Sequence, residues 1–181
     1  MPEVVNSWEG EFIISYLSRW IVSEDVINKA SVAAINFHPA SPDYPGVGCN
    51  NFALYENAST YGVTCHHMLG KVDTGNIIAV KRFPVFDSDD VEALLSRTYD
   101  FQLALFYDVA EKLLRKEALP VSDEKWSRRP FSRKEFNLLE LITPEMSQEE
   151  IERRVRATSY GAWQPKIKLG DFIFELKASR K

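Results

Sequence analysis

The chain has 181 residues, the size of one domain and enough to bury a substantial core. Hydrophobic residues make up 45% and charged residues 27%, and a net charge of −4 gives no basic surface for a nucleic acid. No stretch is long and apolar enough to span a bilayer, and no basic region followed by an apolar run begins the chain. Two cysteines, Cys49 and Cys65, form neither a disulfide framework nor a metal-binding motif, so a cytoplasmic protein is expected.

The first predicted elements are a strand, a short helix and a second strand. Residues 12–16 form a short apolar run, typical of a buried parallel strand with helices on both faces of the sheet. Residues 23–30 begin with a serine that can cap a helix, followed by two acidic residues, and residues 32–37 are a second apolar run. The sequence therefore predicts a βαβ unit with its usual right-handed crossover.

The middle of the chain is predicted to contain a helix, a hairpin and a long helix. Residues 48–58 are expected to be helical, and residues 61–69 and 76–86 to be two strands around a tight turn. Residues 87–116 have acidic residues at their start, apolar residues at helical spacing and basic residues at their end. This segment is predicted to be the long helix that covers the sheet.

A smaller C-terminal part is expected to follow. Residues 119–130 are polar and contain prolines, which indicates a boundary. Residues 132–136 and 147–157 each begin with Ser and carry Glu three residues later, the capping-box pattern of a helix start. Residues 165–176 read as two short strands around a Gly-Asp turn. These elements predict a small α+β segment after an α/β core.

Asn36 and His38 stand where the second predicted strand ends. Positions two apart in a strand share a face, so the amide and the imidazole are directed to one place. Two interpretations of this pair remain open. It is either structural, a capped strand end with a hydrogen-bonded histidine, or part of a catalytic site. An amide can donate to an oxyanion, a histidine can move a proton near neutral pH, and Asp73 in the predicted turn can orient that histidine. The combination suits acyl transfer without a protein nucleophile.

Two further histidines, His66 and His67, lie on the first strand of the predicted hairpin. Because neighbours in a strand face opposite ways, at most one of them can face His38, and His67 is expected to face the other side. A zinc site needs three or four converging ligands, and the chain offers no standard spacing for one. No metal is therefore expected.

The order of these residues forms a longer motif. The sequence "NFH" at residues 36–38 is followed by "GVTCHHMLGKVDTG" at residues 62–75, that is, Asn-x-His, then Gly-Val-Thr-x-His and Asp-x-Gly. This set closely resembles the catalytic signature of the folate-dependent formyltransferase family. The stretches "SYLSRWIV", "HPASPDYPGVGC" and "RATSYGAW" are similar to the sugar N-formyltransferases in particular, so the likeness covers nearly the whole chain.

The resemblance implies a Rossmann-like formyltransferase core with a mixed sheet over residues 1–118, followed by a small α+β segment over residues 119–181. The family begins with a doubly wound sheet, and a βαβ unit takes roughly 30 residues or more. Only one such unit fits before Asn36, so the core is expected to be shortened at its N-terminus. An exposed sheet edge would favour a homodimer.

The resemblance also implies an activity: transfer of a formyl group from 10-formyltetrahydrofolate to a primary amine. Asn36 would stabilise the tetrahedral oxyanion, His38 would mediate proton transfer, and Asp73 would fix His38 or relay a proton through water. The segments that match the folate-binding loops of the family contain Arg19, Trp20, Ile21, Met68, Leu69, Gly70, Lys71 and Val72, with His66 supporting Asp73 and the pocket. Considered alone, Trp20 is as readily a core aromatic.

The similarity to sugar N-formyltransferases implies a nucleotide-linked amino sugar as acceptor, such as a dTDP-4-amino-4,6-dideoxyhexose. A neutral amine would attack the formyl carbon directly, without a covalent enzyme intermediate. One alternative is a non-catalytic or partner-dependent remnant that keeps the folate pocket. Another is the same chemistry on a different amine, such as methionyl-tRNA, against which the acidic composition argues. Arg128 and Arg129 are either ligands of a nucleotide diphosphate or exposed charges of the linker.

Overall fold

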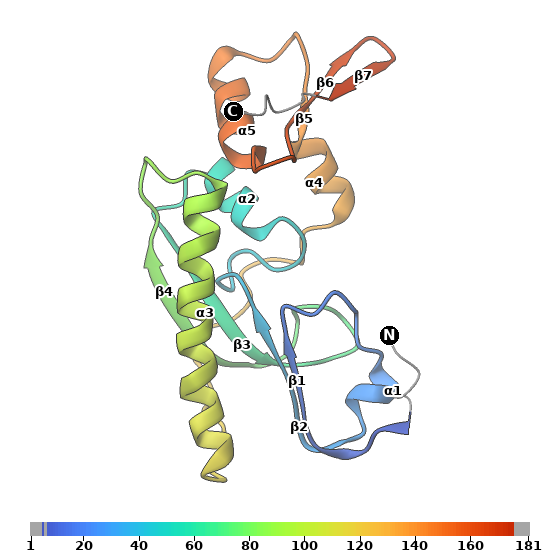
Figure 1. Ribbon diagram of the computed structural model, residues 1–181, viewed down its shortest axis with the longest axis vertical. Helices are drawn as coiled ribbons and strands as arrows, with labels where there is room; N and C mark the ends of the chain where they lie inside the picture. Colours follow the sequence, from blue (N-terminus) through green and yellow to red (C-terminus); the bar gives the residue numbers. More distant parts are fainter. Residues whose placement is uncertain (1–4, 6, 176–181) are drawn as a thin grey trace.

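The computed structural model describes residue 5 and residues 7–175 of the chain. A four-stranded sheet fills one half of an elongated molecule, and a smaller three-stranded sheet lies at the other end (Figure 1). The strands of the larger sheet are β1 (Gly10–Tyr16), β2 (Ala30–His38), β3 (Thr60–His67) and β4 (Ile77–Pro84), and those of the smaller are β5 (Leu141–Ile142), β6 (Lys166–Leu169) and β7 (Phe172–Glu175). The helices are α1 (Glu24–Ile27), α2 (Cys49–Tyr55), α3 (Val91–Leu114), α4 (Arg133–Leu139) and α5 (Gln148–Thr158).

The larger sheet is mixed and has the strand order β1-β2-β3-β4. β1 and β2 are parallel, as the predicted βαβ unit requires, whereas β2, β3 and β4 are antiparallel to one another in succession. The α/β fold class with a mixed sheet is therefore confirmed. Among the described residues, no helix has the length and the apolar character needed to cross a membrane.

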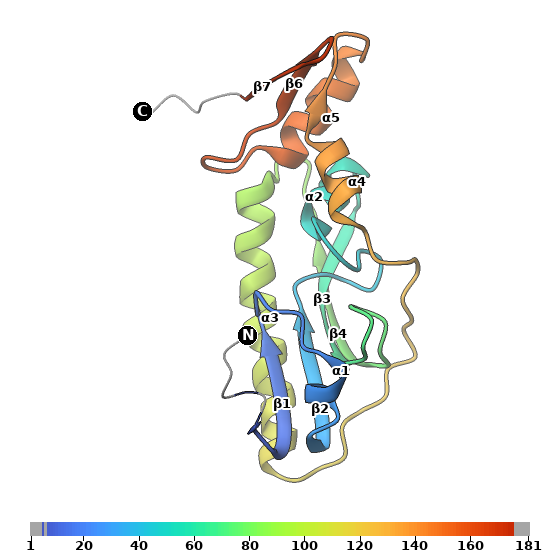
Figure 2. The same ribbon diagram turned by 90° about the vertical axis from the view of Figure 1, so that its right-hand side faces the viewer.

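The long helix α3 covers one face of this sheet, and the segment that follows it crosses the other face (Figure 2). Asp90 caps the helix by accepting a hydrogen bond from the Ala93 N–H at 2.8 Å, so the helix begins at Val91, four residues later than predicted. Leu94, Leu105 and other residues at helical spacing are buried against the sheet in the main core. The predicted cover of the sheet is thus confirmed, and it leaves the opposite face for the site.

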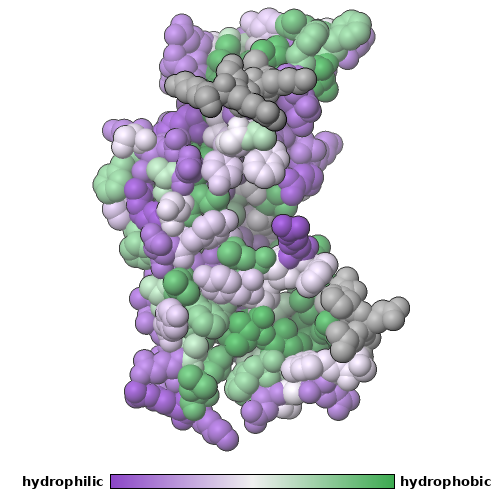
Figure 3. All heavy atoms as spheres, viewed as in Figure 1, coloured by the Kyte–Doolittle hydropathy of each residue, from purple (hydrophilic) through white to green (hydrophobic). Residues whose placement is uncertain are grey.

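The prediction that the first strand is buried is wrong. In the described part of the chain β1 is an edge strand that pairs only with β2, and none of its residues is fully buried. The Ile14 side chain is 43% exposed, because α3 packs mainly on β3 and β4 and leaves β1 partly uncovered. Figure 3 shows the resulting apolar surface in the lower half of the molecule, over α3 and β1.

Two other local predictions also need correction. The first helix is shorter than predicted, because β2 already pairs with β1 from Ala30 onward, and Ser23 stands at the N-cap without a side-chain capping bond. The connection between β3 and β4 is not a tight turn but a loop over residues 68–76. This loop folds back toward β2: the Met68 N–H donates to the Ala34 carbonyl at 2.8 Å.

The C-terminal elements form as the capping patterns predict. Ser132 and Glu135 make the complete capping box at the start of α4, and the Ser147 side chain accepts from the Glu150 N–H at the start of α5. Helix α5 packs on α2, where the Asn51 side-chain amide donates to a carbonyl of α5 at 2.6 Å. The division of the chain into two domains at residue 118 remains a prediction.

We predict that Leu94→Ala lowers the free energy of unfolding by about 2–5 kcal/mol, because the side chain is fully buried and its removal leaves a cavity. The matched control is Leu114→Ala in the same helix, where the side chain is 85% exposed and the substitution removes no core contact. Urea denaturation followed by circular dichroism measures both. Equal losses in the two variants would contradict the observed packing of α3.

Candidate active site

Strand pairing brings Asn36, His38 and His66 to one face of the sheet, opposite α3. Asn36 and His38 are two apart on β2, and Asn36 is the register partner of His66 on β3. The Asn36 side-chain nitrogen lies 3.1 Å from His66 Nε2. His67, the neighbour of His66, instead lines a separate cavity with Phe12, as the alternation of strand side chains predicts.

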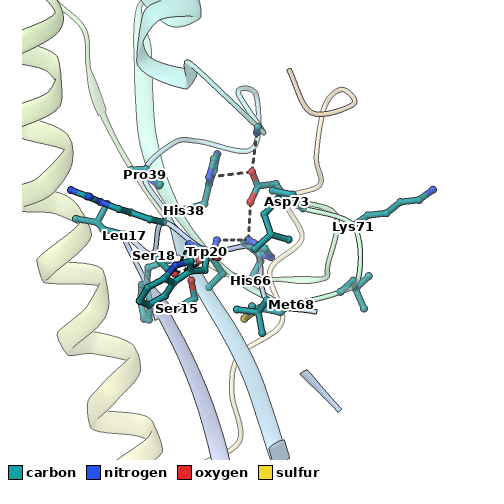
Figure 4. Close-up of a pocket in the computed structure, with 18 residues that line it drawn as sticks. Ser15, Leu17, Ser18, Trp20, His38, Pro39, His66, Met68, Lys71 and Asp73 are labelled. Atoms are coloured by element: carbon teal, nitrogen blue, oxygen red, sulfur yellow. Dashed lines mark hydrogen bonds and ion pairs between the residues drawn. The ribbon is translucent and has the colours of Figure 1, made fainter. Parts of the chain in front are cut away.

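Asp73 joins these residues from the loop between β3 and β4. Its Oδ2 atom lies 3.3 Å from His38 Nδ1, and its Oδ1 atom lies 3.3 Å from His66 Nε2 (Figure 4). The Gly46 N–H donates to Asp73 Oδ2 at 2.8 Å, so a second loop holds the same carboxylate. Asp73 has a φ of 49°, a left-handed conformation that aspartate tolerates better than most residues.

The loop that carries Asp73 also needs a glycine. A Cβ atom at Gly75 would lie 1.8 Å from the His67 carbonyl oxygen, so only glycine allows the loop to pass this close to β3. On the other side of Gly75, its carbonyl accepts a hydrogen bond from Trp126 Nε1 at 2.8 Å. The "DTG" sequence therefore places Asp73 by backbone geometry as well as by charge.

All three titratable groups are buried. The exposed fractions are 4% for His38, 2% for His66 and 4% for Asp73. Burial lowers the pKa of His38 below its ordinary value, and the Asp73 carboxylate offsets only part of this effect. For Asp73, burial alone would raise the pKa, but the two histidines and the Gly46 N–H together lower it. Asp73 is thus a carboxylate at neutral pH, and His38 is a neutral imidazole.

Hydrogen-bond partners limit where protons can lie in this cluster. Each imidazole donates from one nitrogen to a backbone carbonyl: His38 Nε2 to Tyr44 at 3.0 Å, and His66 Nδ1 to His67 at 2.8 Å. The remaining nitrogens face the oxygens of Asp73. A carboxylate only accepts hydrogen bonds, so the contact between His38 Nδ1 and Asp73 becomes a hydrogen bond only when the His38 ring carries a second proton. A proton on His38 Nδ1 would be stabilised by the adjacent negative charge of Asp73.

The segment after His38 is held rigidly against the sheet. The Tyr61 hydroxyl donates to the Pro39 carbonyl at 3.0 Å, and the Thr64 hydroxyl donates to the Ala40 carbonyl at 2.7 Å. Both donors lie on β3 and are fully buried. These bonds fix the loop whose Tyr44 carbonyl accepts from His38.

A cavity of about 350 Å³ opens beside the cluster and is lined by Asn36, His38, His66 and Asp73. All but one of the predicted folate-binding residues line this cavity: Arg19, Trp20, Ile21, His66, Met68, Leu69, Lys71 and Val72. The exception is Gly70, which lies against Glu24. The Trp20 side chain is 55% exposed, which rules out its reading as a core aromatic. Lys71 extends away from the polar cluster (Figure 4).

Sequence reasoning missed Trp126. This residue lies in the polar segment after α3, yet its ring makes edge contacts with both imidazoles, with centroid distances of 5.9 Å to His38 and 5.0 Å to His66. A tryptophan in a segment that is otherwise polar was the available signal. In the same segment Arg128 pairs with Glu56 and Arg129 with Glu135, which favours the reading of these two arginines as structural charges.

Comparison with known proteins identifies the family. Methionyl-tRNA formyltransferase from Levilactobacillus brevis is 31% identical over 101 residues, which cover 55% of this chain and 32% of that protein. The chain thus spans about a third of the length of this curated relative. A sugar N-formyltransferase from Shewanella sp. FDAARGOS_354 has a TM-score of 0.79 at 20% identity, and the match covers 99% of this chain and 72% of that one.

A third protein is similar in both sequence and fold. The N-formyltransferase from Helicobacter canadensis, solved with folinic acid and dTDP-3-aminofucose, has a TM-score of 0.65 at 26% identity, covering 80% of this chain and 53% of that one. Residues 1–110, more than half of the chain, match the formyl transferase family as such. With its Asn-x-His strand end and its buried aspartate between two histidines, the chain belongs to the formyl transferase family.

Proposed function

We propose that this protein transfers a formyl group from 10-formyltetrahydrofolate to the amine of a nucleotide-linked amino sugar. The observation that supports this most strongly is that Asn36, His38 and Asp73 all line one cavity, although helix α2 and strand β3 separate the aspartate from the other two along the chain. These residues supply an amide donor, a proton acceptor and a charge that stabilises the accepted proton.

The cavity suits a folate. Its rim carries exposed apolar side chains, including Trp20 at 55%, Ile21 at 75% and Leu69 at 55%, which a flat aromatic ring system would cover. Arg19 adds a cation to this lining, which suits the carboxylates of a folate tail. When it is bound there, 10-formyltetrahydrofolate supplies the formyl group.

In this proposal Asn36, which lines the cavity, donates to the formyl oxygen. A primary amide has two N–H donors, and the contact with His66 uses one of them. The second N–H would donate to the formyl oxygen and stabilise negative charge that develops on it, since Asn36 lines the cavity. His66 thereby fixes the orientation of the amide and prevents it from rotating.

In this proposal His38 receives the proton that the attacking amine releases. The ring is neutral before reaction because burial lowers its pKa, and Asp73 stabilises the imidazolium once it forms. No protein nucleophile is required. Burial raises the pKa of Cys65 to about 12, so this thiol, adjacent to His66, is not ionised at neutral pH.

The nature of the acceptor is supported by the structural relatives. The likeness to the Shewanella sugar N-formyltransferase extends over 99% of this chain, including the C-terminal segment, and the Helicobacter protein was solved with a dTDP-linked aminosugar. Methionyl-tRNA is the second candidate, because the Levilactobacillus relative acts on it and matches 101 residues. A third outcome is a partner-dependent chain that binds folate without turnover.

We predict that the purified chain adds one formyl group to a dTDP- or UDP-linked amino sugar, and that Asn36→Ala lowers kcat by about 10²–10³-fold through loss of an oxyanion donor. Mass spectrometry of a panel of amino sugars, with methionyl-tRNA included, measures both. His67→Gln is the matched control, since this ring lines a different cavity. Formylation of methionyl-tRNA alone would replace the sugar proposal, and folate binding without any product would favour the partner-dependent chain.

The lowered pKa of His38 predicts a pH dependence of stability. Below pH 6.5, its ordinary pKa, the unfolded chain binds this proton more tightly than the folded chain does, so the free energy of unfolding falls as the pH drops. His38→Gln should remove this part of the fall. Urea denaturation between about pH 7.5 and 5 tests it, together with an NMR titration of the ring. An unchanged slope in the variant would show that His38 is not held neutral.

Trp20→Ala is expected to weaken binding of folinic acid roughly tenfold, about 1.4 kcal/mol, because an aromatic contact at the rim of the cavity is lost. Isothermal titration calorimetry measures the affinity. Trp163→Ala is the control, since that side chain is 68% exposed and stacks on Tyr160 in the C-terminal segment. Equal affinities of Trp20→Ala and the unchanged protein would remove Trp20 from the folate site.

A further inference from the structure

Gln102 is an unusual residue in the core beneath the site. It lies in α3 and is fully buried, and its Nε2 atom donates to the Phe37 carbonyl at 2.7 Å. Its Oε1 atom is also buried and has no hydrogen-bond partner among the described residues. One end of this amide is therefore tightly bound, and the other end is left unsatisfied.

Stability does not explain this arrangement. A buried amide oxygen without a partner is destabilising, because it has lost its hydrogen bonds to water and gained none in return. Methionine has a similar length and volume and would fill the same space without an unpaired oxygen. The hydrogen bond to Phe37 is thus the feature for which the amide is needed.

The carbonyl that Gln102 binds lies near the C-terminal end of β2, the strand that carries Asn36 and His38. Phe37 stands between Asn36 and His38 and pairs with Tyr16, the last residue of β1. The chain then turns away at Leu17, which has a φ of 51°, so the ladder on this side of β2 ends here. Gln102 provides a donor from the helix at the point where the neighbouring strand departs.

The side chain of Phe37 is held on the same side of the sheet. Its ring contacts those of Tyr16 and Phe106, with centroid distances of 5.8 Å and 5.4 Å. Apolar packing of this kind restrains the ring but leaves the adjoining peptide group free to tilt. The Gln102 bond acts on the peptide itself, whose N–H belongs to His38.

We propose that Gln102 is a positioning residue for formyl transfer: by binding the Phe37 carbonyl, it fixes the peptide plane that orients Asn36 and His38 toward the cavity. This role rests on the function proposed above. His38 Nδ1 lies 3.3 Å from Asp73 Oδ2, slightly beyond the usual length of a hydrogen bond, so a tilt of that peptide that moves the ring outward would weaken the contact further. Gln102 acts through the strand and touches neither the substrate nor the cluster.

Two variants test the proposal. Gln102→Met removes the donor and the unpaired oxygen together while keeping the volume. The matched control is Thr98→Val, one turn earlier in α3, where an equally buried hydroxyl donates only to the Leu94 carbonyl of its own helix. Kinetics of formyl transfer are measured for both, along with urea denaturation and the ¹⁵N NMR signals of the His38 ring and the Asn36 side chain.

We expect Gln102→Met to lower kcat by about 10–100-fold, as small misplacements of catalytic groups do, with KM for the folate unchanged. Its NMR signals at His38 and Asn36 should shift, whereas Thr98→Val should keep both kcat and these signals. Unchanged kcat and signals in Gln102→Met would overturn the proposal, as would equal effects of the two variants. If the unsubstituted protein shows no turnover, the proposed function fails, and the NMR comparison still decides whether Gln102 orients the strand.

Discussion

The site depends on one buried carboxylate placed between two imidazoles. Each carboxylate oxygen of Asp73 contacts one imidazole, and the Gly46 N–H donates a hydrogen bond to Oδ2. None of these contacts involves an arginine or a lysine. Its charge is therefore balanced only by groups that can themselves gain or lose a proton. A charge held in this way is costly in an apolar core but useful in catalysis, because it stabilises the cation that a proton transfer creates. The loops, the glycine and the tryptophan around it serve to hold that geometry.

The two faces of the larger sheet differ in what they pack against. One face is apolar and packs on the helix, and the other carries the polar cluster and the cavity. The backbone of β2 connects the two faces. Phe37 packs toward the helix, and its neighbours Asn36 and His38 face the site. Precision at the cluster is therefore set partly by residues that lie on the far side of the sheet.

Much of this site could be predicted, because several of its residues lie only a few positions apart in the sequence. Asn36 and His38 share a face by strand periodicity alone, and the helix starts at Ser132 and Ser147 follow from their capping residues. The exposure of β1 was not predictable, since an apolar run has the same sequence whether or not a helix covers it. Trp126 was missed for another reason: its bond to Gly75 joins residues 51 positions apart, and no local pattern encodes such a contact.

Trp126 gives the segment after α3 a place in the chemistry as well as in the fold. Its ring touches both histidines, and its indole N–H binds the loop that carries Asp73. A change in this segment would therefore alter the surroundings of His38, His66 and Asp73 without replacing any of these three residues. If the proposed function holds, exchanging this segment between relatives would change the rate of formyl transfer, because Trp126 contacts both histidines.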